Sequence, residues 1–148
     1  MGRDSPPRGA IRQELAENRR PSGGRVHDDA RVPIALMIVD DNARFRLRAR
    51  RRLEADGYTV VAEAADGASA LEAARRHRPD VVLLDIGLPD MSGLSVAERL
   101  TREPGRPAVV LTSTRDALDF GDRVTTCGAR GFVPKGELSG DAISALLA

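Results

Sequence analysis

Apolar runs that stop at polar residues mark the folded part of this chain. The run 34–39 ends at a pair of aspartates, and the run 81–84 ends at a single aspartate. The run 108–111 stops at a threonine, and the short run 131–133 lies just before a lysine. Short runs that are apolar throughout predict strands buried on both faces. The partly alternating segment 58–64, rich in β-branched residues, predicts one more strand between the first two runs, which makes five in all.

The segments between these runs have helical periodicity. Residues 43–55 place Phe45, Ala49 and Leu53 on one stripe and end before Gly57, a residue that favours the end of a helix. Strands that alternate with helices of this size predict an α/β fold, a five-stranded parallel sheet with helices on both faces. The other predicted helices are 67–78, 94–101, 114–126 and 138–147.

The first 31 residues have a different composition. They are rich in arginine, proline and glycine, and their only sizeable apolar residues are Ile11, Leu15 and Val26. Such a segment buries too little surface to offset its chain entropy, so the prediction is a disordered tail at 1–31 and one folded domain at 32–148. The chain has no apolar stretch of membrane-spanning length and no secretory signal pattern, so we expect a cytoplasmic protein. A net charge of +1 and an aromatic content of 3% argue against nucleic acid as a partner.

Polar residues with a shared chemistry follow the predicted strands. Asp40 and Asp41 come after the first strand, Asp85 after the third, Thr112 after the fourth and Lys135 after the fifth. The carboxyl ends of parallel strands meet at one edge of a sheet, where ligands bind. Three carboxylates there repel one another unless a cation lies between them, and oxygen ligands suit Mg²⁺. A lysine and a hydroxyl beside them suit the oxygens of a transferred phosphoryl group.

Each of these residues also has a purely structural explanation. Asp41 or Asn42 is in position to cap the next helix, and Asp85 alone is typical of a turn. Thr112 alone is a common strand residue, and Lys135 alone is a common surface charge. The structural explanations do not predict that four strand ends all carry the residue types that phosphoryl chemistry needs, so the combination favours the functional interpretation.

From residue 33 to residue 147 the chain resembles the receiver domain of bacterial two-component response regulators. The sequence Ile-Val-Asp-Asp-Asn at 38–42 resembles the acidic pair of the family, and 83–93 resembles its phosphoacceptor strand and loop. Residues 111–113 match the strand end that bears the hydroxyl, and 131–135 match the strand that carries an aromatic residue and a lysine. The resemblance implies the (βα)5 flavodoxin-like receiver fold.

The resemblance also implies a role for each site residue. Asp85 is the implied phosphoacceptor, with Lys135 and Thr112 contacting the phosphoryl oxygens. The implied Mg²⁺ ligands are Asp41, Asp85 and the backbone carbonyl of Gly87, with Asp40 acting through water. Phe132 is implied to be the aromatic residue that moves with Thr112 when the domain switches.

The implied phosphoryl donor is a sensor histidine kinase or a histidine phosphotransfer protein. The expected protein is not an enzyme beyond its own phosphorylation and dephosphorylation. We expect a stand-alone, single-domain regulator that acts in trans on an output protein, with homodimerisation on phosphorylation left open. The alternative is a phosphorylation-independent pseudo-receiver that only binds proteins. A metal-dependent phosphatase is disfavoured, because it needs a second acid where Gly87 stands.

The predicted helix 43–55 carries six arginines, and three interpretations of them stay open. In the family this helix lies near the surface that docks the kinase, so the arginines are candidates for an electrostatic docking face for an acidic partner. They are equally typical of a solvated helix face. Contact with nucleic acid is the least favoured interpretation, because no recognition motif accompanies the charge. The arginines are Arg44, Arg46, Arg48, Arg50, Arg51 and Arg52.

Overall fold

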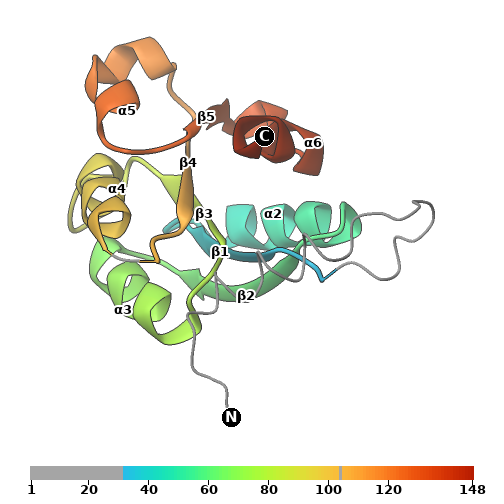
Figure 1. The fold of residues 1–148 in the computed structure, drawn as a ribbon. Helices are drawn as coiled ribbons and strands as arrows, with labels where there is room; N and C mark the ends of the chain where they lie inside the picture. Colours follow the sequence, from blue (N-terminus) through green and yellow to red (C-terminus); the bar gives the residue numbers. More distant parts are fainter. Residues whose placement is uncertain (1–31, 104) are drawn as a thin grey trace. The chain divides into compact units, whose positions relative to one another are not determined.

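The computed structural model describes residues 32–103 and 105–148, so the predicted tail at 1–31 lies outside the described residues. The unit Ile34–Ala148 contains one five-stranded parallel sheet in the order β2-β1-β3-β4-β5 (Figure 1). This is the predicted α/β architecture. The strands are β1 (Ala35–Val39), β2 (Thr59–Ala64), β3 (Val81–Asp85), β4 (Ala108–Ser113) and β5 (Gly131–Pro134).

Helices cover both faces of the sheet, as predicted. Helices α3 and α4 lie on one side and α2 and α6 on the other (Figure 1). Their bounds are α2 (Ala43–Ala55), α3 (Gly67–His77), α4 (Gly93–Arg102) and α6 (Gly140–Leu147). The short helix α5 (Arg123–Thr126) and the 3-10 turns η2 (Ala117–Phe120) and η3 (Lys135–Glu137) complete the set.

The prediction of one helix over 114–126 is wrong. The structure has the four-residue turn η2 and the four-residue helix α5 instead, separated by Gly121 at φ 70°. A positive φ interrupts a right-handed helix. The segment also lacks a continuous apolar stripe, since Val124 is buried while Leu118 is 87% exposed. Without an apolar face to bury, a helix of this length has little to stabilise it.

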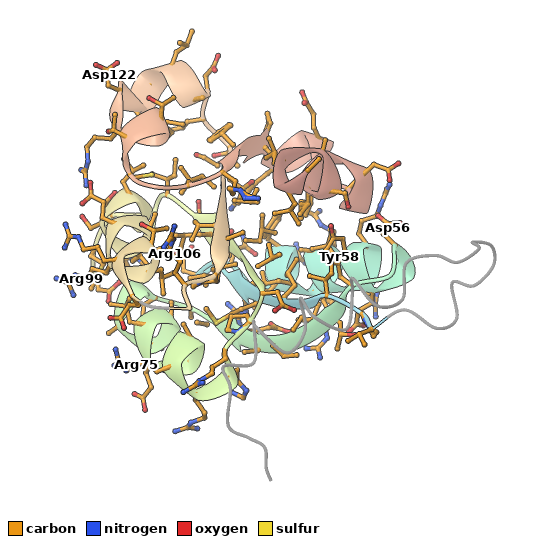
Figure 2. The ribbon with its side chains drawn as sticks, viewed as in Figure 1. Asp56, Tyr58, Arg75, Arg99, Arg106 and Asp122 are labelled. Atoms are coloured by element: carbon orange, nitrogen blue, oxygen red, sulfur yellow. The ribbon has the colours of Figure 1, made fainter. Side chains whose placement is uncertain are left out.

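Side chains from the segment between α2 and β2 hold helix α6. Asp56 accepts a hydrogen bond at 2.7 Å from the backbone N–H of Gly140, the first residue of α6 (Figure 2). The hydrogen bond from that N–H lowers the pKa of Asp56 below its usual range, and a hydrogen bond from the guanidinium of Arg52 adds a smaller effect in the same direction. The hydroxyls of Tyr58 and Ser144 form a second link at 2.7 Å. These contacts fix α6 beside α2, on the face opposite α3 and α4.

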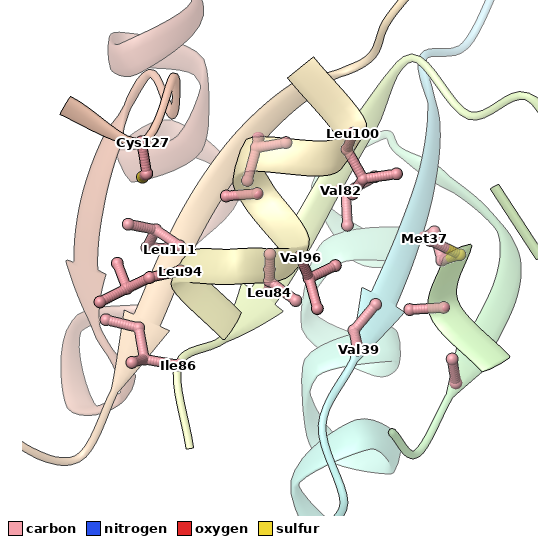
Figure 3. Close-up of a cluster of buried hydrophobic side chains, with 14 of the residues drawn as sticks. Met37, Val39, Val82, Leu84, Ile86, Leu94, Val96, Leu100, Leu111 and Cys127 are labelled. Carbon is pink, nitrogen blue, oxygen red and sulfur yellow. The ribbon is translucent and has the colours of Figure 1, made fainter. Parts of the chain in front are cut away.

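Two apolar clusters, one on each face of the sheet, form the core. Alternate residues of β1 point to opposite faces, as the period of a strand requires. Met37 and Val39 therefore pack with α4 in one cluster (Figure 3), while Leu36 and Ile38 pack with α2 and α6 in the other. All four side chains are fully buried, each contributing about 1.5–3 kcal/mol of hydrophobic stabilisation. A rigid sheet thus fixes where its polar strand ends lie.

Candidate phosphoacceptor and metal site

The acidic pair lies directly after β1. Asp40 is fully buried, and its Oδ1 accepts a hydrogen bond from the N–H of Asn42 at 2.8 Å. Its Oδ2 makes no hydrogen bond of good geometry but lies 2.5 Å from the ammonium nitrogen of Lys135. Asp41 is exposed, and its carboxylate has no protein partner in the described part of the chain. One acid is therefore fixed by the protein and the other is free to bind a ligand.

The structure shows which of residues 41 and 42 caps helix α2. Asn42 has extended backbone angles, and its side chain accepts a hydrogen bond from the N–H of Phe45 at 3.0 Å. Asn42 is therefore the N-cap, the position at which such a side chain stabilises a helix by about 1 kcal/mol. Asp41 is not needed for capping.

Asp85 ends β3, in the middle of the sheet edge. It is 6% exposed, its Oδ1 accepts the N–H of Gly87 at 3.2 Å, and its Oδ2 lies 3.5 Å from Nζ of Lys135. Burial raises the pKa of Asp85 above its usual range, and the nearby Asp40 carboxylate raises it further. Lys135 and the Gly87 N–H oppose this shift without cancelling it. The surroundings of Asp85 thus favour its neutral form more than water does.

Lys135 lies among three partners at the end of β5. Its ammonium contacts Asp40 and Asp85 and lies 4.5 Å from the centre of the Phe45 ring. A cation over an aromatic face gains about 0.5–2 kcal/mol. Lys135 is also the only lysine in the chain. The sequence predicted Phe45 as a core residue, and its contact with Lys135 was missed. The signal that could have indicated this contact is the position of Phe45 in the first helical turn after the acidic pair.

Thr112 lies beside Asp85 in the sheet, because the two residues pair in the β3–β4 register. Its hydroxyl is buried and donates a hydrogen bond to the backbone carbonyl of Val133 at 2.6 Å. Phe132, the predicted switch residue, precedes that carbonyl and is half-buried against the cluster on the α4 side. The hydroxyl is therefore used within the sheet and is not directed to a carboxylate.

The loop after Asp85 is anchored by a residue that sequence reasoning did not select. Asp90 accepts hydrogen bonds from the N–H groups of Gly67 and Ala68, at 2.7 and 2.9 Å, and these lower its pKa. Gly87, the predicted carbonyl ligand, is exposed and forms a bridge with Ser92 in the same loop. Asp90 lies two residues before Ser92, the N-cap of α4. This position gave no signal in the sequence of a contact with the first residues of α3, which are 23 and 22 residues away along the chain.

The structure brings the three predicted carboxylates together. One carboxylate oxygen from each of Asp40, Asp41 and Asp85 lies within 4.8 Å of the others. A family model, the response regulator receiver domain, matches residues 36–146. The chain belongs to this family.

Similar proteins agree with this assignment. The transcriptional regulatory protein PdtaR of Mycobacterium tuberculosis is 34% identical over 127 residues, which cover 84% of this chain and 60% of that protein. The nitrate/nitrite response regulator NarP of Escherichia coli is 39% identical over 105 residues, covering 70% of this chain and 49% of NarP. The chain therefore spans about half the length of the curated relatives it matches.

Solved structures support the receiver fold independently. A two-component response regulator of the LuxR family from Aurantimonas has a TM-score of 0.71 and 31% identity, covering 78% of this chain and 86% of that one. The receiver domain of the response regulator NarL from Mycobacterium tuberculosis has a TM-score of 0.69 and 33% identity, covering 78% and 98%. The five-stranded sheet is thus the flavodoxin-like receiver fold. In the part of the chain that the structure describes, no helix is both long enough and apolar enough to cross a bilayer.

The acidic site of this receiver domain fits a hard divalent cation. Three carboxylates meet with one ammonium, so the cluster has an excess of negative charge. Its oxygens are the ligand type that Mg²⁺ prefers. The exposed Asp41 carboxylate, which has no protein partner in the described residues, is a further reason to expect a cation here.

The arginines of α2 divide into two groups in the receiver domain. Arg46, Arg50 and Arg52 form ion pairs with acids of this chain, at 3.0, 2.6 and 2.9 Å at their closest. Arg44, Arg48 and Arg51 are exposed and have no such partner in the described residues, and they flank Leu47, which is 47% exposed. The first group has a structural role. The docking face for an acidic partner stays a prediction, now restricted to the second group.

Asparagine at position 85 is expected to stabilise the metal-free receiver domain at neutral pH and to remove the stabilisation by Mg²⁺. The amide avoids the cost of a buried charge beside Asp40, a gain on the order of 1 kcal/mol. Because the folded-state pKa of Asp85 is raised, the neutral acid stabilises the wild-type protein at low pH, and this contribution is lost as pH rises through that pKa. The gain from Asp85→Asn should therefore shrink as pH falls.

Urea unfolding with and without MgCl₂ measures both effects. Mg²⁺ that binds the folded state alone should raise the stability of the wild-type protein, and it should do so far less in the variant. A wild-type protein whose stability does not respond to Mg²⁺ would contradict the expected metal site.

Proposed function

We propose that this receiver domain accepts a phosphoryl group on Asp85 in a magnesium-dependent reaction. The observation that carries the proposal is the position of Asp85, a nearly buried carboxylate 3.5 Å from the only lysine and within 4.8 Å of two further carboxylates. A carboxylate in that position can act as a nucleophile only if its charge and that of the incoming phosphoryl group are offset. Lys135 and a bound cation supply that offset.

Mg²⁺ is proposed to bind Asp41, Asp85 and the Gly87 carbonyl directly and Asp40 through water. The cation, when bound, neutralises the charge that develops on the phosphoryl oxygens. The chain's own residues do the rest. Asp40 holds Lys135 in place, and the N–H of Gly87 orients one oxygen of Asp85, leaving the other to face the phosphorus.

The donor is proposed to be a phosphohistidine on a sensor histidine kinase or a histidine phosphotransfer protein. An oxygen of Asp85 forms a bond to phosphorus as the phosphorus–nitrogen bond to the histidine breaks. The imidazole leaves with the bonding electrons and takes up a proton. The protein contributes position and charge rather than a further covalent step.

The switch is proposed to start at Thr112. Its hydroxyl is bound to the carbonyl of Val133, so donating to a phosphoryl oxygen on Asp85 requires it to leave that carbonyl. The neighbouring Phe132 side chain, half-buried against the cluster on the α4 side, is proposed to move with it. Two alternative hydrogen bonds for one buried hydroxyl give the domain two states, and phosphorylation biases their populations.

The route of the output is a separate hypothesis. PdtaR, the relative named as a transcriptional regulatory protein, is longer than this chain, so its output does not transfer to this chain directly. We propose that the phosphorylated domain acts in trans by binding an output protein. Size-exclusion chromatography of the protein with and without phosphorylation tests whether it forms a homodimer instead, and a new dimer would favour self-association as the output.

Incubation with acetyl phosphate tests the proposed chemistry without a kinase. The wild-type protein should gain one phosphoryl group by intact mass, and only with Mg²⁺ present. Asp85→Asn should gain none, since the amide is not a nucleophile. No gain by the wild-type protein under any condition would favour the alternative, a pseudo-receiver that binds proteins independently of phosphorylation.

A further inference from the structure

Arg46 reaches back from α2 to the backbone of the acidic pair. Its Nη1 donates a hydrogen bond at 2.6 Å to the carbonyl oxygen of Asp40, the group that joins Asp40 to Asp41. The Arg46 side chain is largely covered, with 20% of its surface exposed. A charged donor to a covered carbonyl makes one of the stronger hydrogen bonds in proteins.

A second contact fixes the orientation of the Arg46 side chain. Its Nε donates to Oε1 of Glu63 in β2 at 3.0 Å, and Oε2 of Glu63 accepts from Arg50 at 2.6 Å. Glu63 is therefore held by two arginines, and Arg46 is held between Glu63 and Asp40. The N–H of Asp40 is also bound, to the carbonyl of Ala64 at 3.0 Å. Both sides of the Asp40 backbone are thus anchored, one by β2 and one by Arg46.

We propose that Arg46 is a positioning residue for the metal site. The proposal rests on the proposed function, since it assumes that the acidic pair binds Mg²⁺. The exposed carboxylate of Asp41 has no protein partner in the described residues, so the backbone alone sets where it lies. The peptide group that Arg46 holds is the one that leads into Asp41. Loss of this contact lets the Asp41 carboxylate move away from Asp85.

The charge of Arg46 has the opposite effect on a bound cation. A guanidinium close to the site repels Mg²⁺, so removing its charge alone would tighten metal binding. This repulsion is small here, because Glu63 lies 3.0 Å from the guanidinium and offsets its charge. The positioning contact is short and direct, so we expect it to decide the outcome. The sign of the change in affinity therefore separates positioning from charge.

Titration of the full-length protein with MgCl₂ by isothermal calorimetry tests the proposal. Arg46→Met keeps the aliphatic stem and removes the donor, and it should weaken Mg²⁺ binding about 10-fold or more, the usual effect of losing a group that orients a metal ligand. Arg50→Met is the matched control. Arg50 lies on the same helix as Arg46 and pairs with the same glutamate, Glu63, but it touches no residue of the site. The affinity of this variant for Mg²⁺ should therefore stay within about 2-fold of wild type.

The outcomes are distinguishable. Equal or tighter Mg²⁺ binding by Arg46→Met would overturn the proposal, and so would equal weakening in Arg50→Met. If Arg46→Met does not fold, Arg46→Lys replaces it; lysine keeps the charge and loses the forked donor, so binding should still weaken, and unchanged binding overturns the proposal. Urea unfolding without metal identifies a general loss of stability. No Mg²⁺ binding by the wild-type protein would reject the metal site, and with it both proposals.

Discussion

Methionine in place of Lys135 is expected to slow phosphorylation by acetyl phosphate about 100-fold or more. The ammonium lies 3.5 Å from Asp85 and is the only cationic side chain in contact with both buried acids among the described residues. Removing one donor that stabilises developing charge on transferred oxygens typically costs about 10²–10³ in rate. The measurement is the rate of the gain in intact mass at saturating Mg²⁺.

The same substitution should also lower the stability of the metal-free protein by about 3 kcal/mol. It leaves the carboxylate of Asp40 buried without its ion-pair partner, and breaking a buried pair from one side costs about 3–5 kcal/mol. We take the lower value because Lys135 is 16% exposed. Mg²⁺ should restore most of this loss. The control is Lys135→Arg, which keeps the charge. An unchanged phosphorylation rate and an unchanged urea midpoint in the methionine variant would show that Lys135 is only a surface charge.

Alanine in place of Gly93 is expected to destabilise the domain by about 1–3 kcal/mol and to disturb Asp85. Gly93 begins α4 and donates its N–H to the carbonyl of Ile86 at 2.8 Å. An added Cβ would lie 2.7 Å from the Cα of Ile86 and would overlap the carbonyl oxygen of Asp85. These neighbours are backbone atoms, so the helix or the strand end must shift, as in an overpacked core. The phosphorylation rate should fall together with the urea midpoint.

Gly136→Ala provides the control for Gly93→Ala. Gly136 follows Lys135, so it lies at the same edge, but its backbone φ is not positive and an added Cβ would meet no atom within 4 Å. Alanine there should leave stability unchanged or raise it by up to about 1 kcal/mol, because it restricts the unfolded chain. A Gly93→Ala protein as stable and as reactive as Gly136→Ala would show that α4 does not fix the position of Asp85.

The strand ends could be predicted from sequence because a simple rule places them. Apolar runs define the strands, parallel order brings their carboxyl ends to one edge, and Asp40, Asp41 and Asp85 therefore meet. The 114–126 helix was predicted wrongly because composition alone does not show that Gly121 takes a positive φ or that Leu118 is left exposed.

The supporting contacts of the site could not be predicted in the same way. The ring of Phe45 beneath Lys135, the reach of Arg46 to the Asp40 carbonyl and the anchoring of Asp90 on α3 all depend on how each helix packs on the sheet. Periodicity identifies a helix and its buried stripe, but it does not give that packing. The direction of the Thr112 hydroxyl depends likewise on its register with Val133.

Mapping the modified residue tests the central claim most directly. Protein treated with acetyl phosphate and Mg²⁺ is reduced with borohydride, which converts a phosphorylated aspartate to homoserine, and its peptides are sequenced by mass spectrometry. We predict homoserine at position 85 alone, and none when Mg²⁺ is withheld. Modification at another aspartate, or a phosphoryl group carried on a histidine, would contradict the assignment of Asp85 as the phosphoacceptor.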